Sequence, residues 1–275
     1  MATTDDTQFV IELAESEIDE VRAPFKLQDL PEKEMQDYRM ILKEAASTLE
    51  LYANLVSVVH GTMSPGGPAA SVILLDFGFI GSQSHGRRFR HARIDVGFSH
   101  INHVLGGPCD PELVCISPLY GKLLRRSTKD PGRFEVIIRG WEMAKSRDTG
   151  FVTLSGIKRI EGRRYGGRNQ ARWRIKENDN DRDGIPSLLR VAILVQPQDN
   201  KGFRATVNIK VKTDLLHGAT MAIKKLCGKT IMEPVHFNGI EPRQSLNPEM
   251  LGELDLESLA NADLDKFVMI GSSTL

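Results

Sequence analysis

Three aspartates at alternate positions, Asp179, Asp181 and Asp183, precede a glycine in the stretch ENDNDRDGIPSLLRVAILV, residues 177–195. An EF-hand calcium loop opens in this way, but it needs a bidentate glutamate at its twelfth position, which here is Arg190. It also needs helices on both sides, whereas the flanking segments are rich in strand-forming residues. We therefore interpret the stretch as a solvated turn between two strands.

Four histidines, His85, His91, His100 and His103, lie within nineteen residues of one another. Their spacing matches no standard metal cluster, and the basic residues beside them would repel a cation. The chain also lacks a P-loop, a GxSxG elbow and a dinucleotide-binding fingerprint. The sequence therefore predicts neither a bound metal nor a cofactor.

Two charged residues stand alone in apolar surroundings. Asp76 is the single charge in SVILLDFGF (71–79), and Arg190 is the single charge in SLLRVAILV (187–195). Buried charges are costly unless they are paired. One interpretation is that Asp76 and Arg190 meet across the sheets. The other is that Arg190 points into an apolar cavity and donates a hydrogen bond to a ligand carbonyl or carboxylate.

A basic segment, KRIEGRRYGGRNQARWRIK (158–176), carries eight Lys and Arg residues with Tyr165 and Trp173 among them. Such a segment could follow phosphates and stack on bases. However, its basic and apolar residues alternate, which is typical of a strand with one solvated face. We therefore do not expect nucleic acid to be the partner.

In RRFRHARIDVGF the face with Phe89, His91, Arg93 and Asp95 is polar enough to line a pocket or to face water.

Period-two patterns separated by turns rich in Gly, Pro, Asn and Asp predict an antiparallel β-sandwich or distorted barrel. Flanking helices are predicted from about 31 to 55, where apolar residues recur at helical spacing, and from 214 to 228. We assign residues 1–53 to an acidic N-terminal extension, 54–213 to the β domain and 214–275 to a helix and acidic tail. The predicted strands are 71–79, 87–101, 112–118, 133–144, 151–162, 169–177, 187–197 and 203–213.

The net charge of zero conceals a basic middle between acidic ends. Residues 1–50 have a net charge of −8, residues 233–275 of −6, and the segment between them of +14. Either the ends fold back and neutralise the middle, or the middle presents a basic surface to a partner. Three cysteines without a CxxC spacing, no secretory signal and no long apolar span predict a cytoplasmic protein that does not span a membrane.

Several stretches resemble a family of largely uncharacterised β-rich proteins from filamentous fungi. The resemblance rests on DFGFIGSQSHGRRFRHARIDVGF (76–98), GWEM (140–143), YGGRNQARWRIKEN (165–178) and GIPSLLRVAILV (184–195). It covers roughly residues 54–213 and implies no particular active-site residue. Some similar proteins belong to secondary-metabolite pathways, in which small cofactor-free proteins act as cyclases or isomerases.

Two functions are compatible with these observations. The first is a cofactor-independent cyclase or isomerase of natural-product biosynthesis, for example for an intramolecular [4+2] addition, acting on an apolar terpenoid or polyketide. Arg190 would then be the catalytic donor, and the substrate-binding walls would be Trp141, Trp173, Tyr120 and Phe98. The alternative is a non-catalytic β-sandwich protein whose basic face binds a protein, lipid or nucleic-acid partner. The sequence does not determine the oligomeric state.

Overall fold

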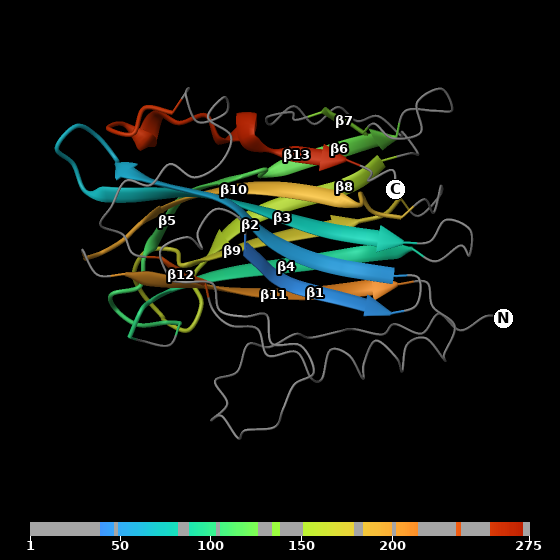
Figure 1. Ribbon diagram of the computed structural model, residues 1–275, viewed down its shortest axis with the longest axis horizontal. Coiled ribbons are helices and arrows are strands. Elements are labelled where there is room, and N and C mark those ends of the chain that lie inside the picture. The colour runs from blue at the N-terminus through green and yellow to red at the C-terminus, as the bar shows by residue number, and fades with distance from the viewer. Residues whose placement is uncertain are drawn as a thin grey trace, which may run out of the picture.

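The computed structural model describes residues 39–46, 49–81, 88–102, 105–125, 134–137, 151–178, 184–199, 202–213, 235–237 and 254–271. These residues form two antiparallel sheets that do not close into a barrel, so the fold is a β-sandwich as the strand pattern predicts (Figure 1). Its first sheet has six strands and its second has seven.

The first sheet has the order β1–β2–β3–β10–β13, and β5 also pairs with β10, beside the stretch that β13 contacts. The longest of these strands, β2 and β3, form a hairpin that β10 extends. The strands of this sheet are β1 (Arg39–Ala46), β2 (Leu49–Thr62), β3 (Ala69–Gly81), β5 (Glu112–Ser117), β10 (Leu188–Gln196) and β13 (Met269–Gly271).

The second sheet has the order β12–β11–β4–β9–β8–β6–β7. Its centre is the run β11–β4–β9–β8, in which every neighbouring pair is antiparallel. The strands of this sheet are β4 (Phe89–His100), β6 (Tyr120–Arg125), β7 (Phe134–Ile137), β8 (Phe151–Arg159), β9 (Gln170–Lys176), β11 (Phe203–Thr213) and β12 (Val235–Phe237).

The main hydrophobic core lies between the sheets. Alternate residues of each strand point inward, because successive side chains of a strand point to opposite faces. On β11, for example, the residues from Phe203 to Val211 at odd positions are all buried and those between them are half-buried. The largest fully buried side chains of this core are Trp173, Phe77, Phe98, Phe203, Ile73, Leu75 and Ile94.

The predicted N-terminal helix is wrong over the part of it that the structure describes. Residues 39–46 and 49–62 form the antiparallel hairpin of β1 and β2, so sheet structure begins before residue 54. Leu49, Leu51, Ala53 and Leu55 are all buried, which is a strand period of two. A register shift between Leu55 and Ser57 interrupts that alternation, and the many helix-forming residues obscured it.

The C-terminal segment 254–271 packs on the outer face of the first sheet. It contains the 3-10 turns η2 (Leu259–Asn261) and η3 (Leu264–Phe267), and then adds β13 to the sheet edge. Its Leu259, Leu264 and Phe267 join a second hydrophobic cluster with outward-facing side chains of β2, β3 and β10. The predicted helix 214–228 lies outside the described residues.

Candidate functional site

Arg190 and Asp76 form an ion pair, as the first of the two interpretations predicts. Arg190 Nε lies 2.7 Å from Asp76 Oδ1, and Arg190 Nη2 lies 2.9 Å from Asp76 Oδ2. The residues do not meet across the sheets. They are direct register partners on neighbouring strands, β10 and β3, of the same sheet. The ion pair with Asp76 raises the pKa of Arg190, which keeps the guanidinium charged.

This ion pair lies on the outer face of the first sheet. Asp76 alternates with Leu75 and Phe77, which point into the main core, and shares a face with Leu74 of the second cluster. Two guanidinium nitrogens of Arg190, Nε and Nη2, already donate hydrogen bonds to the carboxylate of Asp76. Arg190 therefore faces away from the space between the sheets, and its catalytic role stays a prediction.

The two expected wall residues Trp173 and Phe98 lie in the main core. Each has 0% of its surface exposed, whereas a side chain that lined a space large enough for a guest would have exposed surface. Trp173 Nε1 donates a hydrogen bond of 2.9 Å to the carbonyl oxygen of Pro118. Gly156 lies against this indole, because a Cβ there would come within 2.8 Å of Trp173 Nε1.

The other two expected wall residues are not brought together with these. Tyr120 is 45% exposed at the start of β6, and Trp141 lies outside the residues that the structure describes. A depression of about 150 Å³ occurs elsewhere, within the C-terminal segment, between Leu254, Ser258 and Phe267. Drug-sized ligands occupy pockets of roughly 300–1,000 Å³. The cyclase therefore stays a prediction from the sequence.

The outer face of the second sheet gathers basic side chains from four neighbouring strands. Strand register places these side chains in rows across β11, β4, β9 and β8. One row contains Lys212, His91, Lys176 and Thr153. The next contains Lys210, Arg93, Arg174 and Ser155, and continues to Tyr120 on β6.

We call the outward-facing side chains of these four strands the basic face. It carries eight bases and one acid, a net charge of +7 with His91 neutral. The bases are Arg93, Arg159, Arg172, Arg174, Lys176, Arg204, Lys210 and Lys212, and the acid is Asp95. Of these bases, Arg174 and Lys210 have no ion pair or hydrogen bond with any described residue.

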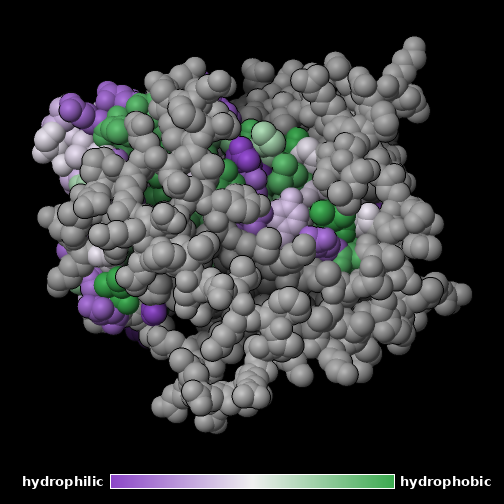
Figure 2. Space-filling model, in the orientation of Figure 1, coloured by the Kyte–Doolittle hydropathy of each residue, from purple (hydrophilic) through white to green (hydrophobic). Residues whose placement is uncertain are grey.

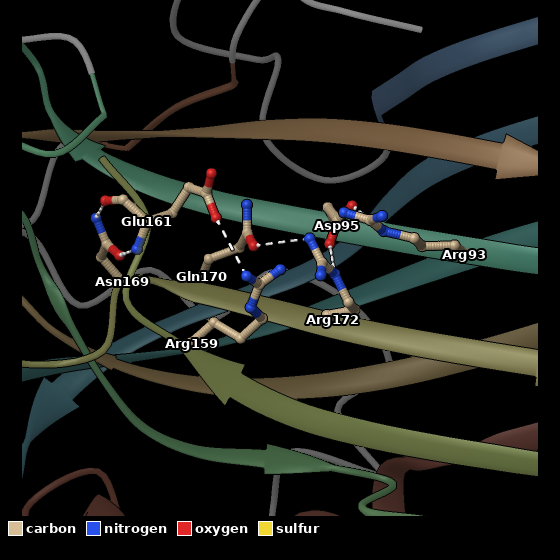
Figure 3. Close-up of polar contacts among 7 residues, drawn as sticks. All are labelled: Arg93, Asp95, Arg159, Glu161, Asn169, Gln170 and Arg172. Carbon is tan, nitrogen blue, oxygen red and sulfur yellow. Dashed lines mark hydrogen bonds and ion pairs between the residues drawn. The ribbon is translucent and has the colours of Figure 1, made fainter. Parts of the chain in front are cut away.

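Asp95 lies between two arginines (Figure 3). Arg93 Nε donates to Asp95 Oδ2 at 2.8 Å, and Arg172 Nε donates to Asp95 Oδ1. The carboxylate is largely buried, and its burial raises the pKa of Asp95 although Arg93 favours the charged form. The single acid of the basic face is thus occupied by internal partners and offers little to an external cation.

Further polar contacts fix the end of the face near the β8–β9 connection. Figure 3 shows Arg159 beside Glu161 and Gln170 beside Arg172. Asn169 is completely buried, and its amide donates to the carbonyl oxygen of Glu161 and to Asp110. These contacts hold the β8–β9 loop against the sheet beside Arg159 and Arg172.

Phe89 differs from its predicted place on the polar face. The register between β11 and β4 shifts after Lys212, so that Thr213 pairs with Phe89 and Arg90 is passed over. Phe89 is therefore buried, whereas His91, Arg93 and Asp95 stay on the outer face. The four strands and their alternation were visible in the sequence, but the register that joins their basic positions was not.

The histidines and aspartates with possible metal-ligand character do not converge within the described chain. His91 lies on the basic face, and His100 Nε2 lies 3.3 Å from Asp199 Oδ2. His85, His103, Asp179, Asp181 and Asp183 lie outside the described residues. Strands β9 and β10 flank the aspartate stretch, in agreement with its interpretation as a connection between strands.

Comparisons with known proteins add no family. No family model and no curated protein matches the chain. A matching solved structure is the Clostridium perfringens NetB toxin in its membrane-inserted form, with 10% identity over 64% of this chain and 84% of that chain. The TM-score is 0.23, at which no inference about fold or function follows. Within the described residues, no helix has the length and apolar character needed to cross a bilayer.

Proposed function

We propose that this chain is a non-catalytic binding protein whose basic face docks on an anionic phospholipid surface. The observation that carries the proposal is the gathering of eight bases against one acid on one side of a single sheet. An anionic membrane attracts basic groups at its surface by about 1 kcal/mol for each Lys or Arg.

The distribution of charge across the sandwich supports docking in one orientation. The basic face is the outer side of the second sheet, and the segment 254–271 lies on the outer side of the first. That segment has four acids and one base, a net charge of −3. An anionic surface would attract the basic face and repel the side that carries segment 254–271. It would therefore orient the molecule before contact.

The neighbours of the basic residues favour lipid over nucleic acid. Tyr120, which is 45% exposed, borders the basic face on β6, and Ile157, which is 47% exposed, lies within it on β8. An aromatic and an aliphatic side chain beside cations suit the boundary between headgroups and acyl chains. Among the described residues of the face itself there is no row of aromatic side chains on which successive bases could stack.

The test is co-sedimentation of the full chain with vesicles of about three parts phosphatidylcholine to one part phosphatidylserine, and with phosphatidylcholine alone. The variant is Arg174→Glu with Lys210→Glu, because neither side chain has an ion pair with a described residue. Arg164→Glu with Arg168→Glu is the matched control. These two exposed arginines of the β8–β9 loop give the same change of charge outside the four strands that form the basic face.

We expect the parent to bind only the anionic vesicles and the face variant to bind at least about 25-fold more weakly, since two favourable charges are lost. The control should lose much less affinity. Equal losses in both variants would show that only net charge matters and would contradict the proposal. Binding of single-stranded RNA by the parent without binding of vesicles would assign the basic face to nucleic acid instead.

A further inference from the structure

His91 lies among cations in the row at one end of the basic face. It is the register partner of Lys212 on β11 and of Lys176 on β9. Two residues further along these strands, Lys210 and Arg174 lie on the same face, and Arg93 follows on β4 itself. The side chains that neighbour His91 from three strands are therefore basic, and the nearest acid of the face, Asp95, is held by Arg93 and Arg172.

We infer that His91 makes anion binding by the basic face proton-linked: an anionic headgroup that docks beside Lys176 and Lys212 draws a proton onto the imidazole. Anionic surfaces are then bound more tightly at mildly acidic pH than at alkaline pH. This inference rests on the proposed function and adds to it a means of regulation.

The physical basis is the reversal of a repulsion. Partial burial lowers the pKa of His91, and Lys212, Arg174, Lys176 and Arg93 lower it further by their positive charges. Among the described residues, no carboxylate forms a hydrogen bond with this imidazole. A bound phosphate or carboxylate group would cancel the repulsion from the cations and would raise the pKa of His91.

Thermodynamic linkage converts that change into affinity. When binding raises the pKa of a group, the ligand binds more tightly once the pH falls below the bound value. Suppose that binding raises the pKa of His91 by about one unit. The protein would then bind about tenfold more tightly at a pH below the pKa of His91 in the free protein than at a pH above its pKa in the complex. Phosphatidylserine keeps its negative charge over this range, so the protein supplies the pH dependence.

The experiment measures binding of the full chain to the same phosphatidylserine vesicles at about pH 5.5 and about pH 8. The readout is the ratio of the association constant at the lower pH to that at the higher pH. The variants are His91→Gln, which cannot gain a charge, and His91→Arg, which always carries one. We expect a ratio of about ten for the parent and a ratio near one for both variants. His91→Arg should bind tightly at both pH values.

A direct readout accompanies this. The imidazole signal of His91 should titrate at higher pH when the vesicles are present than when they are absent, in a nuclear magnetic resonance titration. A ratio that persists in His91→Gln, or an unchanged titration of His91 in the complex, would overturn the inference while leaving the proposed function intact. Failure of the parent to bind these vesicles at either pH would overturn the proposed function and the inference with it.

Discussion

The outer faces of the two sheets differ in what covers them. On the first sheet, Val72, Leu74, Ala192 and Leu194 point outward, and the segment 254–271 buries them. On the second sheet, half of the outward positions of β4, β9 and β11 hold Lys or Arg. Figure 2 shows one side of the molecule, on which hydrophobic and hydrophilic side chains of the described residues lie next to one another.

The difference explains the patterns of the strands. A sheet that is covered on both faces has strands that are apolar almost throughout, such as β3 and β10. In the second sheet, β9 and β11 instead alternate between apolar residues that point into the core and mostly basic or polar residues that point outward. Asp76 and Arg190 stood out only because their strands belong to the covered sheet. They pair on the outer face of that sheet, and Met269 of β13 is the register partner of Arg190 on the other side of β10.

The largest effect is expected where the cover meets the first sheet. Phe267 is only 5% exposed in the second hydrophobic cluster. We expect Phe267→Ala to reduce the free energy of unfolding by about 3–5 kcal/mol. The matched control is Met269→Ala, since Met269 is 45% exposed and should cost only about 0.5 kcal/mol. Urea unfolding measures both, and equal losses would show that the segment does not bury this face in solution.

A slightly smaller effect is expected at the ion pair. The side chains of Arg190 and Asp76 are 15% and 14% exposed, so Arg190→Met leaves a largely buried carboxylate without its partner. We expect a loss of about 3 kcal/mol in the free energy of unfolding.

The double variant Arg190→Met with Asp76→Leu should recover most of that loss, because no unpaired charge remains. Arg174→Met on the basic face is the comparison and should change stability by about 0.5 kcal/mol or less. If the single variant were as stable as the parent, the ion pair would contribute nothing to the fold. The double variant also tests the predicted cyclase, because cyclisation that survives in it would exclude a catalytic role for Arg190.

The smallest effect is the pH dependence of stability that His91 contributes. The folded protein holds the pKa of His91 below its ordinary value, so the unfolded chain binds a proton over a range in which the folded chain does not. Stability is therefore unaffected well above the ordinary value and decreases as the pH falls from there to the folded pKa. His91→Gln should decrease this slope between about pH 7 and about pH 5, as urea unfolding measures. An unchanged slope would place the titration elsewhere.

The sequence by itself predicted an antiparallel β-sandwich or distorted barrel, and it located the strands β3 to β5 and β7 to β11 but not β6. Alternation and turn residues are local properties, and they sufficed for this. It failed for the hairpin of β1 and β2, because helix-forming residues and a register shift concealed the strand period. A local propensity is weak where pairing with a neighbouring strand decides the conformation.

Only the tertiary structure decided which charges meet. Asp76 and Arg190 are 114 residues apart in the chain, and the rows of the basic face combine strands that begin at Phe89, Phe151, Gln170 and Phe203. Which positions align depends on the register, and a shift of one residue would move every side chain to the opposite face. Individual strands show which residues point outward, but the pairing of all four strands is what makes those residues one surface.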